Sequence, residues 1–201
     1  MTFWDFCSPI YDFVQRRNVN YDRWMQAVVD CIEKDSAILE VAGGTGEISI
    51  RIASKAKHVV CTDISEKMLQ VAEKKAKDIS NISFKICNIY DINFDDNAFD
   101  TVIASQVLHL LDHPKAAIDE LARVAKDKII LPICLLKDIK GFAKFQVNVW
   151  RLLGFKPRYT FDQEGYIKFL KKFNLNVVSS TFIEGSMPIL VVVCQKDKVR
   201  L

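Results

Sequence analysis

The sequence predicts an α/β fold with a mostly parallel sheet, and three observations support it. Apolar runs alternate with helical patterns along most of the 201-residue chain. Strands that are apolar throughout and separated by helices are typical of a parallel sheet covered on both faces. The last two apolar runs are joined only by the short segment 184–187. They must pair as an antiparallel hairpin because a parallel pair needs a long crossover, so one strand near an edge should be reversed.

Each element follows from an apolar run or from a helical spacing of apolar residues. The predicted strands cover residues 37–42, 58–63, 82–87, 100–105, 128–133, 175–183 and 188–195. The predicted helices cover residues 46–56, 65–78, 114–126 and 162–173, and residues 1–36 become helical after an aromatic start. Pro114 suits the first position of its helix. No repeat or linker divides the chain, so we expect one domain over residues 1–201.

Composition narrows the class of protein. Half of the residues are hydrophobic, 26% are charged and the net charge is +3, which is ordinary for a globular protein and gives no sign of a nucleic-acid partner. We see no signal peptide and no uncharged run long enough to span a membrane. The six cysteines form no CxxC pair or cluster, which favours free thiols in a reducing cytoplasm over disulfides or a metal site.

The segment ILEVAGGTGEISIRIA (38–53) places small residues where a buried strand turns into a helix. Strand, glycine-rich turn and helix N-terminus form an arrangement that binds nucleotides. The dinucleotide pattern G-x-G-x-x-G fits in neither register, since Glu47 or Ser49 takes the place of the last glycine. No Gly-Lys-Ser/Thr follows, so the P-loop pattern also fails.

The pattern that fits is E/D-x-G-x-G-x-G, laid on Glu40, Ala42, Gly44 and Gly46. With it the sequence resembles the class I S-adenosylmethionine-dependent methyltransferases, in particular the small-molecule group called the methyltransferase type 11 domain. Segments 59–72, 87–111 and 114–126 resemble the group's later strands and helices in the correct order. There are two departures: Ala42 replaces the usual first glycine, and Asn88 stands where an aspartate is common.

The resemblance implies a Rossmann-like three-layer αβα sandwich. Its seven-stranded sheet would have the order 3-2-1-4-5-7-6, with strand 7 antiparallel. Residues 1–36 and 136–160 lie outside the alternation of strands and helices, so we expect them to form cap or lid segments. Residues 1–25 and 136–160 would then build the pocket for the methyl acceptor.

The resemblance also implies a set of cofactor-binding residues: Tyr11, Glu40, Ala42, Gly43, Gly44, Gly46, Asp63, Ile64, Met68, Asn88, Ile89 and Ser105. Asp63 would accept hydrogen bonds from both ribose hydroxyls; the alternative is a cap of the following helix. Asn88 and the backbone N–H of Ile89 would bind the adenine ring. Ile64 and Met68 would pack on the base, or simply belong to the core.

The other residues of the set belong to the methionine end of the cofactor. The three glycines would pass beneath it, and the backbone of Ser105 would face it. Glu40 would organise the loop and reach the methionine ammonium through water, or be purely structural. Tyr11 would close over the cofactor or pack a helix. His109 is the catalytic candidate, either as a general base or as a group that orients the substrate. The alternative is that His109 simply packs under the cofactor.

Residues 140–153 predict an amphipathic helix. Phe142, Phe145, Val149 and Leu152 share one face, and Lys140, Lys144, Asn148 and Arg151 lie on the other side. Such a helix can lie on a membrane surface. We instead favour a lid whose charged face is solvated.

The predicted function is transfer of a methyl group from S-adenosyl-L-methionine to a small molecule, leaving S-adenosyl-L-homocysteine. The reaction is an in-line displacement, so the protein mainly has to align the nucleophile, the methyl group and the sulfur. An amphipathic lipid or a quinone precursor is the second choice of acceptor. The alternatives are a non-catalytic S-adenosylmethionine-binding regulator and an NAD(P)-dependent oxidoreductase. The sequence leaves the acceptor atom, the need for a base and the oligomeric state open.

Overall fold

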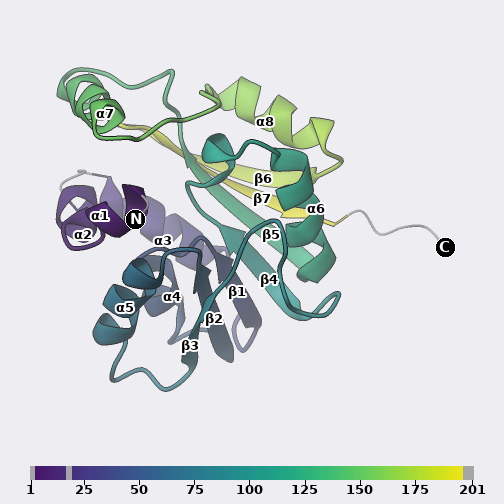
Figure 1. Cartoon of the computed structure of the whole chain (residues 1–201). Coiled ribbons are helices and arrows are strands. Elements are labelled where there is room, and N and C mark those ends of the chain that lie inside the picture. Colours follow the sequence, from purple (N-terminus) through teal and green to yellow (C-terminus); the bar gives the residue numbers. More distant parts are fainter. Residues whose placement is uncertain (1–2, 17–19, 197–201) are drawn as a thin grey trace.

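The computed structural model describes residues 3–16 and 20–196 and contains a seven-stranded sheet flanked by helices (Figure 1). The strand order is β3-β2-β1-β4-β5-β7-β6, which confirms the predicted topology. The strands are β1 (Ala37–Val41), β2 (His58–Asp63), β3 (Ile82–Ile86), β4 (Phe99–Ala104), β5 (Ala125–Cys134), β6 (Asn176–Ile183) and β7 (Ile189–Gln195). β7 is antiparallel to both β5 and β6, and the other neighbours are parallel.

Helices cover both faces of the sheet. They are α1 (Phe3–Cys7), α2 (Tyr11–Gln15), α3 (Tyr21–Asp30), α4 (Glu47–Ile52), α5 (Glu66–Lys75), η1 (Leu108–Leu110), α6 (Pro114–Val124), α7 (Phe142–Leu152) and α8 (Gln163–Lys172). α3 and α4 contribute to one buried cluster, α6 and α8 to the other. α5 packs along β2 and β3.

The inner strands β1, β2, β4, β5 and β7 are mostly apolar because they supply side chains to both layers, whereas the edge strands β3 and β6 are largely exposed. Alternate residues of a strand point to opposite faces. Ile38 therefore packs with α3 and α4, while its neighbour Leu39 packs with α6 and α8. Both side chains are fully buried. This two-sided burial is the physical reason that the inner strands lack a polar face.

Element limits differ from the prediction mainly at helix ends. α6 ends at Val124, two residues earlier than expected, because Ala125 adopts an extended conformation and pairs with Phe99. β5 therefore begins three residues earlier than expected. α4 ends at Ile52 and α5 at Lys75, each before a short turn. Strand pairing and turns set these ends, and the spacing of hydrophobic residues does not predict either of them.

Pro132 lies inside β5, a central strand, where a proline is unusual. The carbonyl of Pro132 accepts a hydrogen bond from the backbone N–H of Gln106, just past the end of β4. The Gln106 side-chain oxygen accepts from the N–H of Cys134 at 2.8 Å. β4 ends before it reaches Pro132, and Gln106 occupies the position beside β5 where β4 would have continued. The proline therefore lacks an N–H at a point where no strand needs it for pairing. Gln106 is thereby held where the sheet opens into the site described next.

Within the described ranges, no helix is long and apolar enough to cross a bilayer. The same residues contain no group of His, Cys, Asp or Glu that could hold a metal ion. All six cysteines are free thiols.

Candidate functional site

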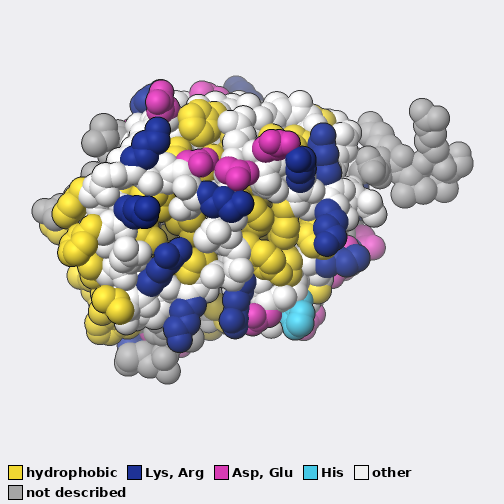
Figure 2. Space-filling model, turned by 90° about the horizontal axis from the view of Figure 1, so that it is seen from above, with side chains coloured by type: hydrophobic (Ala, Val, Ile, Leu, Met, Phe, Trp, Pro, Cys, Tyr) yellow, Lys and Arg dark blue, Asp and Glu magenta, His cyan; other side chains and the backbone are white. Residues whose placement is uncertain are grey.

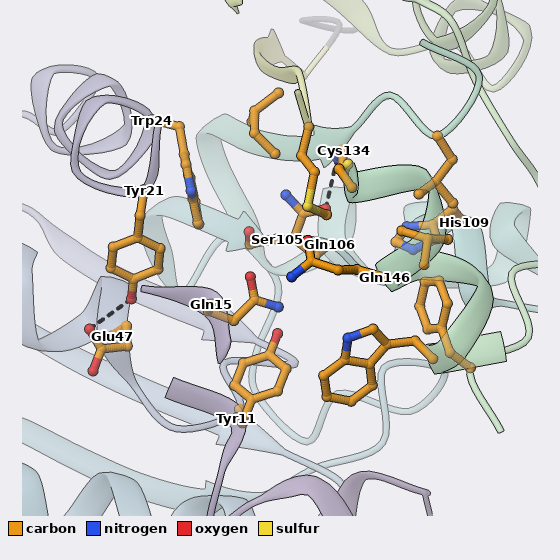
Figure 3. A pocket seen from close by; sticks show the side chains of 18 of the residues that line it. Tyr11, Gln15, Tyr21, Trp24, Glu47, Ser105, Gln106, His109, Cys134 and Gln146 are labelled. Atoms are coloured by element: carbon orange, nitrogen blue, oxygen red, sulfur yellow. Dashed lines mark hydrogen bonds between the residues drawn. The ribbon is translucent and has the colours of Figure 1, made fainter. Parts of the chain in front are cut away.

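A cavity of about 680 Å³ lies at the carboxyl ends of β1, β4 and β5 (Figure 3). Open parallel sheets bind ligands at this edge, and the volume is within the range of small-molecule sites. Helices α1 to α3 border one side and α7 the other, so the two segments predicted to build the acceptor pocket meet here (Figure 1). The lining residues from α1 to α4 and the glycine turn are Trp4, Tyr11, Gln15, Tyr21, Trp24, Met25, Glu40, Ala42, Gly43, Gly44, Thr45, Glu47 and Ile48.

The rest of the lining comes from the carboxyl half of the sheet and from α7. These residues are Ser105, Gln106, His109, Cys134, Leu136, Lys140, Gly141, Phe142, Ala143, Gln146, Val147, Trp150, Phe155, Ser186, Met187 and Ile189. Most of these side chains are apolar or aromatic. The walls near α7 therefore favour an apolar, flat ligand, whereas the glycine turn offers backbone and carboxylate groups.

The glycine turn is shaped by its backbone conformation. Gly44 has a φ of +55°, and a side chain added there would meet nothing within 4 Å, so its position faces open space. Ala42 has a φ of +55° as well, which is strained for a residue with a Cβ and costs on the order of 1–3 kcal/mol. A Cβ on Gly43 would lie 2.6 Å from the Cys61 sulfur. The turn thus needs glycine at Gly43 for space and at Gly44 for φ.

Glu40 lies at the floor of the cavity and is 1% exposed. Its Oε2 accepts hydrogen bonds from the backbone N–H of Ser49 at 3.0 Å and from the Ser49 hydroxyl at 2.5 Å. Burial raises the pKa of Glu40 from 4.5 to about 7, against the bonds from Ser49, which lower it. Among the described residues no cation touches this carboxyl. A cationic ligand group in the cavity would satisfy it.

A charged cluster fastens α2 over the glycine turn. The Lys75 ammonium donates to Asp12 at 2.7 Å and to Glu47 at 2.5 Å. Asp12 also accepts a short hydrogen bond from the Thr45 hydroxyl, and Glu47 accepts from Tyr21 at 2.8 Å. Burial acts to raise the pKa of Glu47, but these hydrogen bonds outweigh it and lower the pKa to about 2. The N-terminal segment is therefore fastened beside the glycine turn, and its role as a cap over the site stays a prediction.

Tyr11 extends from α2 into the cavity beside Gln15 (Figure 3). Burial and the nearby carboxylates of Asp63 and Asp12 raise the pKa of Tyr11, so its hydroxyl stays protonated at neutral pH. Tyr11 therefore lines the cavity in which a ligand is predicted to bind. Its contact with a ligand stays a prediction.

Two buried polar atoms of the cavity have no hydrogen-bond partner among the described residues: Ser105 Oγ and His109 Nδ1. A buried polar group without a partner costs about 1–3 kcal/mol. His109 is 3% exposed and packs edge-to-face on Phe155 at 5.9 Å between ring centres. Burial lowers the pKa of His109 to about 4, so the imidazole is neutral at pH 7. Both atoms are therefore free to bond a polar ligand group.

Several predicted residues lie outside this cavity: Gly46, Asp63, Ile64, Met68, Asn88 and Ile89. Gly46 has a φ of +72°, and a Cβ there would lie 2.9 Å from the Cβ of Ala72. Gly46 thus serves the packing of α4 against α5 rather than the lining of the cavity. The other five residues, which were predicted for the nucleoside end, gather at the ends of β2 and β3.

Asp63 is 8% exposed and accepts backbone hydrogen bonds from Gly44 and Ser65, both at 2.8 Å. The helix cap proposed as its alternative is in fact Ser65, whose hydroxyl accepts from the N–H of Met68. Asp63 instead ties the glycine turn to the start of α5. A carboxylate has further lone pairs, so these bonds leave the ribose role open as a prediction.

Of the other residues predicted to bind the nucleoside, some lie on the surface and some in the core. Ile64 is 61% exposed, whereas Met68 is 2% and Ile89 is 8% exposed. The Asn88 side-chain oxygen accepts from the backbone N–H of Tyr90 at 3.0 Å, so the carbonyl expected to bind adenine is engaged in a turn. Ile64 offers an open apolar surface for a base, while Met68 is core in this structure.

Sequence reasoning missed the polar amides that reach the acceptor side: Gln15, Gln106 and Gln146 (Figure 3). Glutamine is common on helix surfaces, so no pattern marks these three. Gln106 has a φ of +54°, a conformation that only the tertiary structure reveals. The loop between β6 and β7, with Ser186 and Met187, was also not expected at the site.

The site fits S-adenosylmethionine on its own geometry. The open glycine turn can lie beneath a methionine portion, and an ammonium group would give the buried Glu40 the cationic partner that no described residue provides by direct contact. The unpartnered Ser105 hydroxyl lines the same cavity.

Comparisons with known proteins agree with this arrangement. Residues 38–128 match the model of the family described as a methyltransferase domain. A demethylmenaquinone methyltransferase of Clavibacter sepedonicus is 37% identical over 97 residues, which are 48% of this chain and 40% of that protein. A ubiquinone/menaquinone biosynthesis C-methyltransferase UbiE of Zymomonas mobilis is 37% identical over 91 residues, 44% of this chain and 38% of that protein. The chain thus spans about two fifths of the length of these relatives.

Solved structures show the same fold over nearly the whole chain. Magnesium protoporphyrin IX methyltransferase (ChlM) from Synechocystis with bound SAH has a TM-score of 0.68 and 21% identity, covering 89% of this chain and 84% of that one. A putative methyltransferase in complex with the Haloferax volcanii Trm112 activator has a TM-score of 0.75 and 14% identity, covering 96% and 97%.

Proposed function

Because the chain is a class I S-adenosylmethionine-dependent methyltransferase by its fold and by its domain at residues 38–128, we propose that it methylates a flat, largely apolar small molecule. The family uses S-adenosylmethionine. The observation that carries the proposal is the single cavity running from the glycine turn to aromatic walls below α7. One end suits the methionine portion of the cofactor, and the other suits an apolar acceptor.

The cofactor supplies a methyl group on a positively charged sulfur. The chain's own residues have to orient the partners and exclude water. Glu40, Gly44 and Ser105 would hold the methionine end, and Tyr11 would cover it. Trp24, Trp150 and Phe155 would hold the acceptor by its face. No strong base is needed when the acceptor carbon or oxygen is already electron-rich.

His109 and the three glutamine amides supply the polar contacts of the acceptor end. Neutral His109 can accept a hydrogen bond at Nδ1 from a hydroxyl of the acceptor, which would orient the ring. Gln106 is fixed by its bond to the Cys134 N–H, whereas Gln146 projects from the inner side of α7 (Figure 3). An acceptor with an aromatic body and one or two hydroxyl groups fits this set.

A quinone precursor, an amphipathic lipid, is the finer candidate within this class. Its support is the aromatic lining and the similarity of somewhat less than half of the chain to a demethylmenaquinone methyltransferase and a ubiquinone/menaquinone biosynthesis C-methyltransferase. We further propose that residues 1–201 act as one domain, with 1–36 and 136–160 as cover and lid. Location in the cytoplasm and the absence of a nucleic-acid partner stay predictions.

The test is calorimetric titration followed by a transfer assay. The full chain should bind S-adenosylhomocysteine and ignore NAD and NADP. It should then transfer a labelled methyl group to a reduced naphthoquinone lacking its ring methyl, but not to a purely aliphatic alcohol. Binding of S-adenosylhomocysteine with no transfer to any aromatic hydroxyl compound would favour a non-catalytic binder. Binding of NAD alone would refute the proposal.

A further inference from the structure

α7 carries apolar side chains on two sides, and the cavity explains only one. Its inner side, with Ala143 and Val147 buried, lines the cavity. Its outer face, defined by Phe142, Phe145, Val149 and Leu152, is 72%, 61%, 36% and 88% exposed. The predicted lid would have packed this face inward. The structure instead turns it toward solvent, so the lid interpretation does not account for it.

Exposed apolar residues also lie on the N-terminal segment, whose helices border the same cavity as α7. Phe6 and Ile10 are 60% and 51% exposed. α1 and α7 both border the cavity and lie on the same side of the molecule (Figure 1). Phe142 lines the cavity and is also largely exposed, so it marks the place where the cavity opens. Exposed apolar side chains gathered on two elements that border one cavity indicate an interaction surface.

Charge distinguishes the kind of partner. Segment 136–160 contains six Lys or Arg and one acidic residue, Asp138, so it carries +5. The whole chain carries 28 basic and 25 acidic residues, or +3, which leaves −2 for all other residues together. Lys140, Lys144, Arg151 and Lys156 are exposed and form no ion pair with a described residue. Figure 2 shows hydrophobic side chains gathered along one edge of this side of the molecule, with Lys and Arg beside them.

We infer that the outer face of α7, with Phe6 and Ile10, docks on the surface of an anionic lipid bilayer. Exposed aromatic residues beside unpaired cations are the composition of helices that lie in the lipid interface. A second copy of the chain is the poorer occupant, since a symmetric pair would bring the same cations together. The mouth of the cavity would then face the lipid, so that an apolar acceptor could enter directly. This last step rests on the proposed function, whereas the docking itself does not.

The experiment is sedimentation of the full chain with vesicles of phosphatidylcholine, alone or mixed with phosphatidylglycerol. We expect binding to the mixed vesicles, weakened by salt. The double variant Phe142→Ser with Phe145→Ser should lower the partition coefficient at least tenfold. This is the order of the effect expected when one aromatic side chain is no longer buried in the lipid. Lys144→Gln with Arg151→Gln should lower it roughly fivefold per charge, and only on the mixed vesicles.

Controls remove similar groups elsewhere. Ile86→Thr and Val178→Thr change exposed apolar residues on β3 and β6, and Lys171→Gln with Lys172→Gln changes exposed cations on α8. These variants should bind as the unmodified chain does.

A single variant on the docking face, Leu152→Ser, alters a side chain that is 88% exposed, so a loss of vesicle binding by this variant cannot come from unfolding. Calorimetry with S-adenosylhomocysteine checks that every variant keeps its site.

Three results would overturn the inference. The chain could fail to sediment with either kind of vesicle. The α7 variants could bind as well as the controls do. Ultracentrifugation could show a dimer that the double phenylalanine variant abolishes, which would make a second copy the occupant. Vesicle binding without cofactor binding would refute the proposed function and leave this inference intact.

Discussion

Replacing Glu40 by glutamine should remove a pH dependence from both stability and cofactor affinity. Glu40 is fully buried at the end of β1, and burial raises its pKa from 4.5 to about 7. Between these values the folded protein holds a proton that the unfolded chain has lost. The contribution to stability is therefore complete below pH 4.5 and is lost as the pH rises to about 7.

The magnitude follows from the same two values. The difference between 4.5 and about 7 corresponds to about 3 kcal/mol of unfolding free energy. If the ammonium of the cofactor faces Glu40, it favours the ionised carboxylate and returns its pKa to 4.5 or below. Binding then releases the proton, and affinity should rise about tenfold from pH 6 to pH 8. The Glu40→Gln variant has no carboxyl proton to release, so this group should not change its affinity for the ligand between pH 6 and pH 8.

The assay is calorimetric titration with S-adenosylhomocysteine at pH 6, 7 and 8, in buffers of different ionisation enthalpy. The ligand's own amino group titrates equally for both proteins, so the ratio of their affinities isolates Glu40. Thermal unfolding without ligand gives the stability part. Equal pH profiles for the two proteins, with no proton released, would refute the reasoning and assign Glu40 to the structural support of Ser49 alone.

Four further predictions concern single positions. Asp63→Ala should lower S-adenosylhomocysteine affinity at least tenfold and also cost about 1–3 kcal/mol of stability, since two backbone N–H groups lose their acceptor. Gly46→Ala should cost about 2 kcal/mol or more of stability, because its Cβ meets that of Ala72 at a φ of +72°. Gly44→Ala should cost about 1–3 kcal/mol through its φ of +55° alone, and it should also weaken cofactor binding, since its Cβ points into open space. His109→Phe should leave melting temperature and cofactor affinity unchanged and reduce methyl transfer about tenfold or more.

The predictions for Asp63, Gly46 and His109 each have an opposing outcome. An Asp63→Ala protein that melts early yet binds normally would make Asp63 purely structural, and Asp63→Asn is its matched control. If Gly46→Ala melts like the parent, α4 and α5 are not as closely packed as the structure has them. A His109→Phe protein with full activity would place the acceptor away from the imidazole.

The hydrophobic pattern of the sequence predicted most of the strands and helices of the fold. Runs such as 58–63 and 100–105 are apolar on both faces, which only a strand covered by helices on two sides can use. The short segment 184–187 left no topology other than a hairpin for the last two strands. Helix ends were less predictable, since the end of α6 depends on the pairing of Ala125 with Phe99 across the sheet.

The glycine turn was readable in the sequence because its chemistry is local. Glu40, Gly43 and Gly44 are close neighbours in the chain, so their spacing alone indicated a ligand at the end of β1. The same spacing gave no sign that Gly46 also has a packing reason for glycine, which comes from Ala72 on a different helix. A motif gives the residue type, whereas the reason for that type can lie in a tertiary contact.

What the sequence by itself determined is thus the sheet, its reversed strand and the carboxyl-end turn, all of which follow from local pattern. Only the tertiary structure decided which polar atoms of the cavity lack partners, as at Ser105 and His109, because satisfaction depends on everything packed around a group. It also decided which side of α7 faces the protein. The sequence predicts one apolar face on that helix and suggests that it packs inward, whereas the structure buries Ala143 and Val147 and leaves the predicted apolar face in solvent.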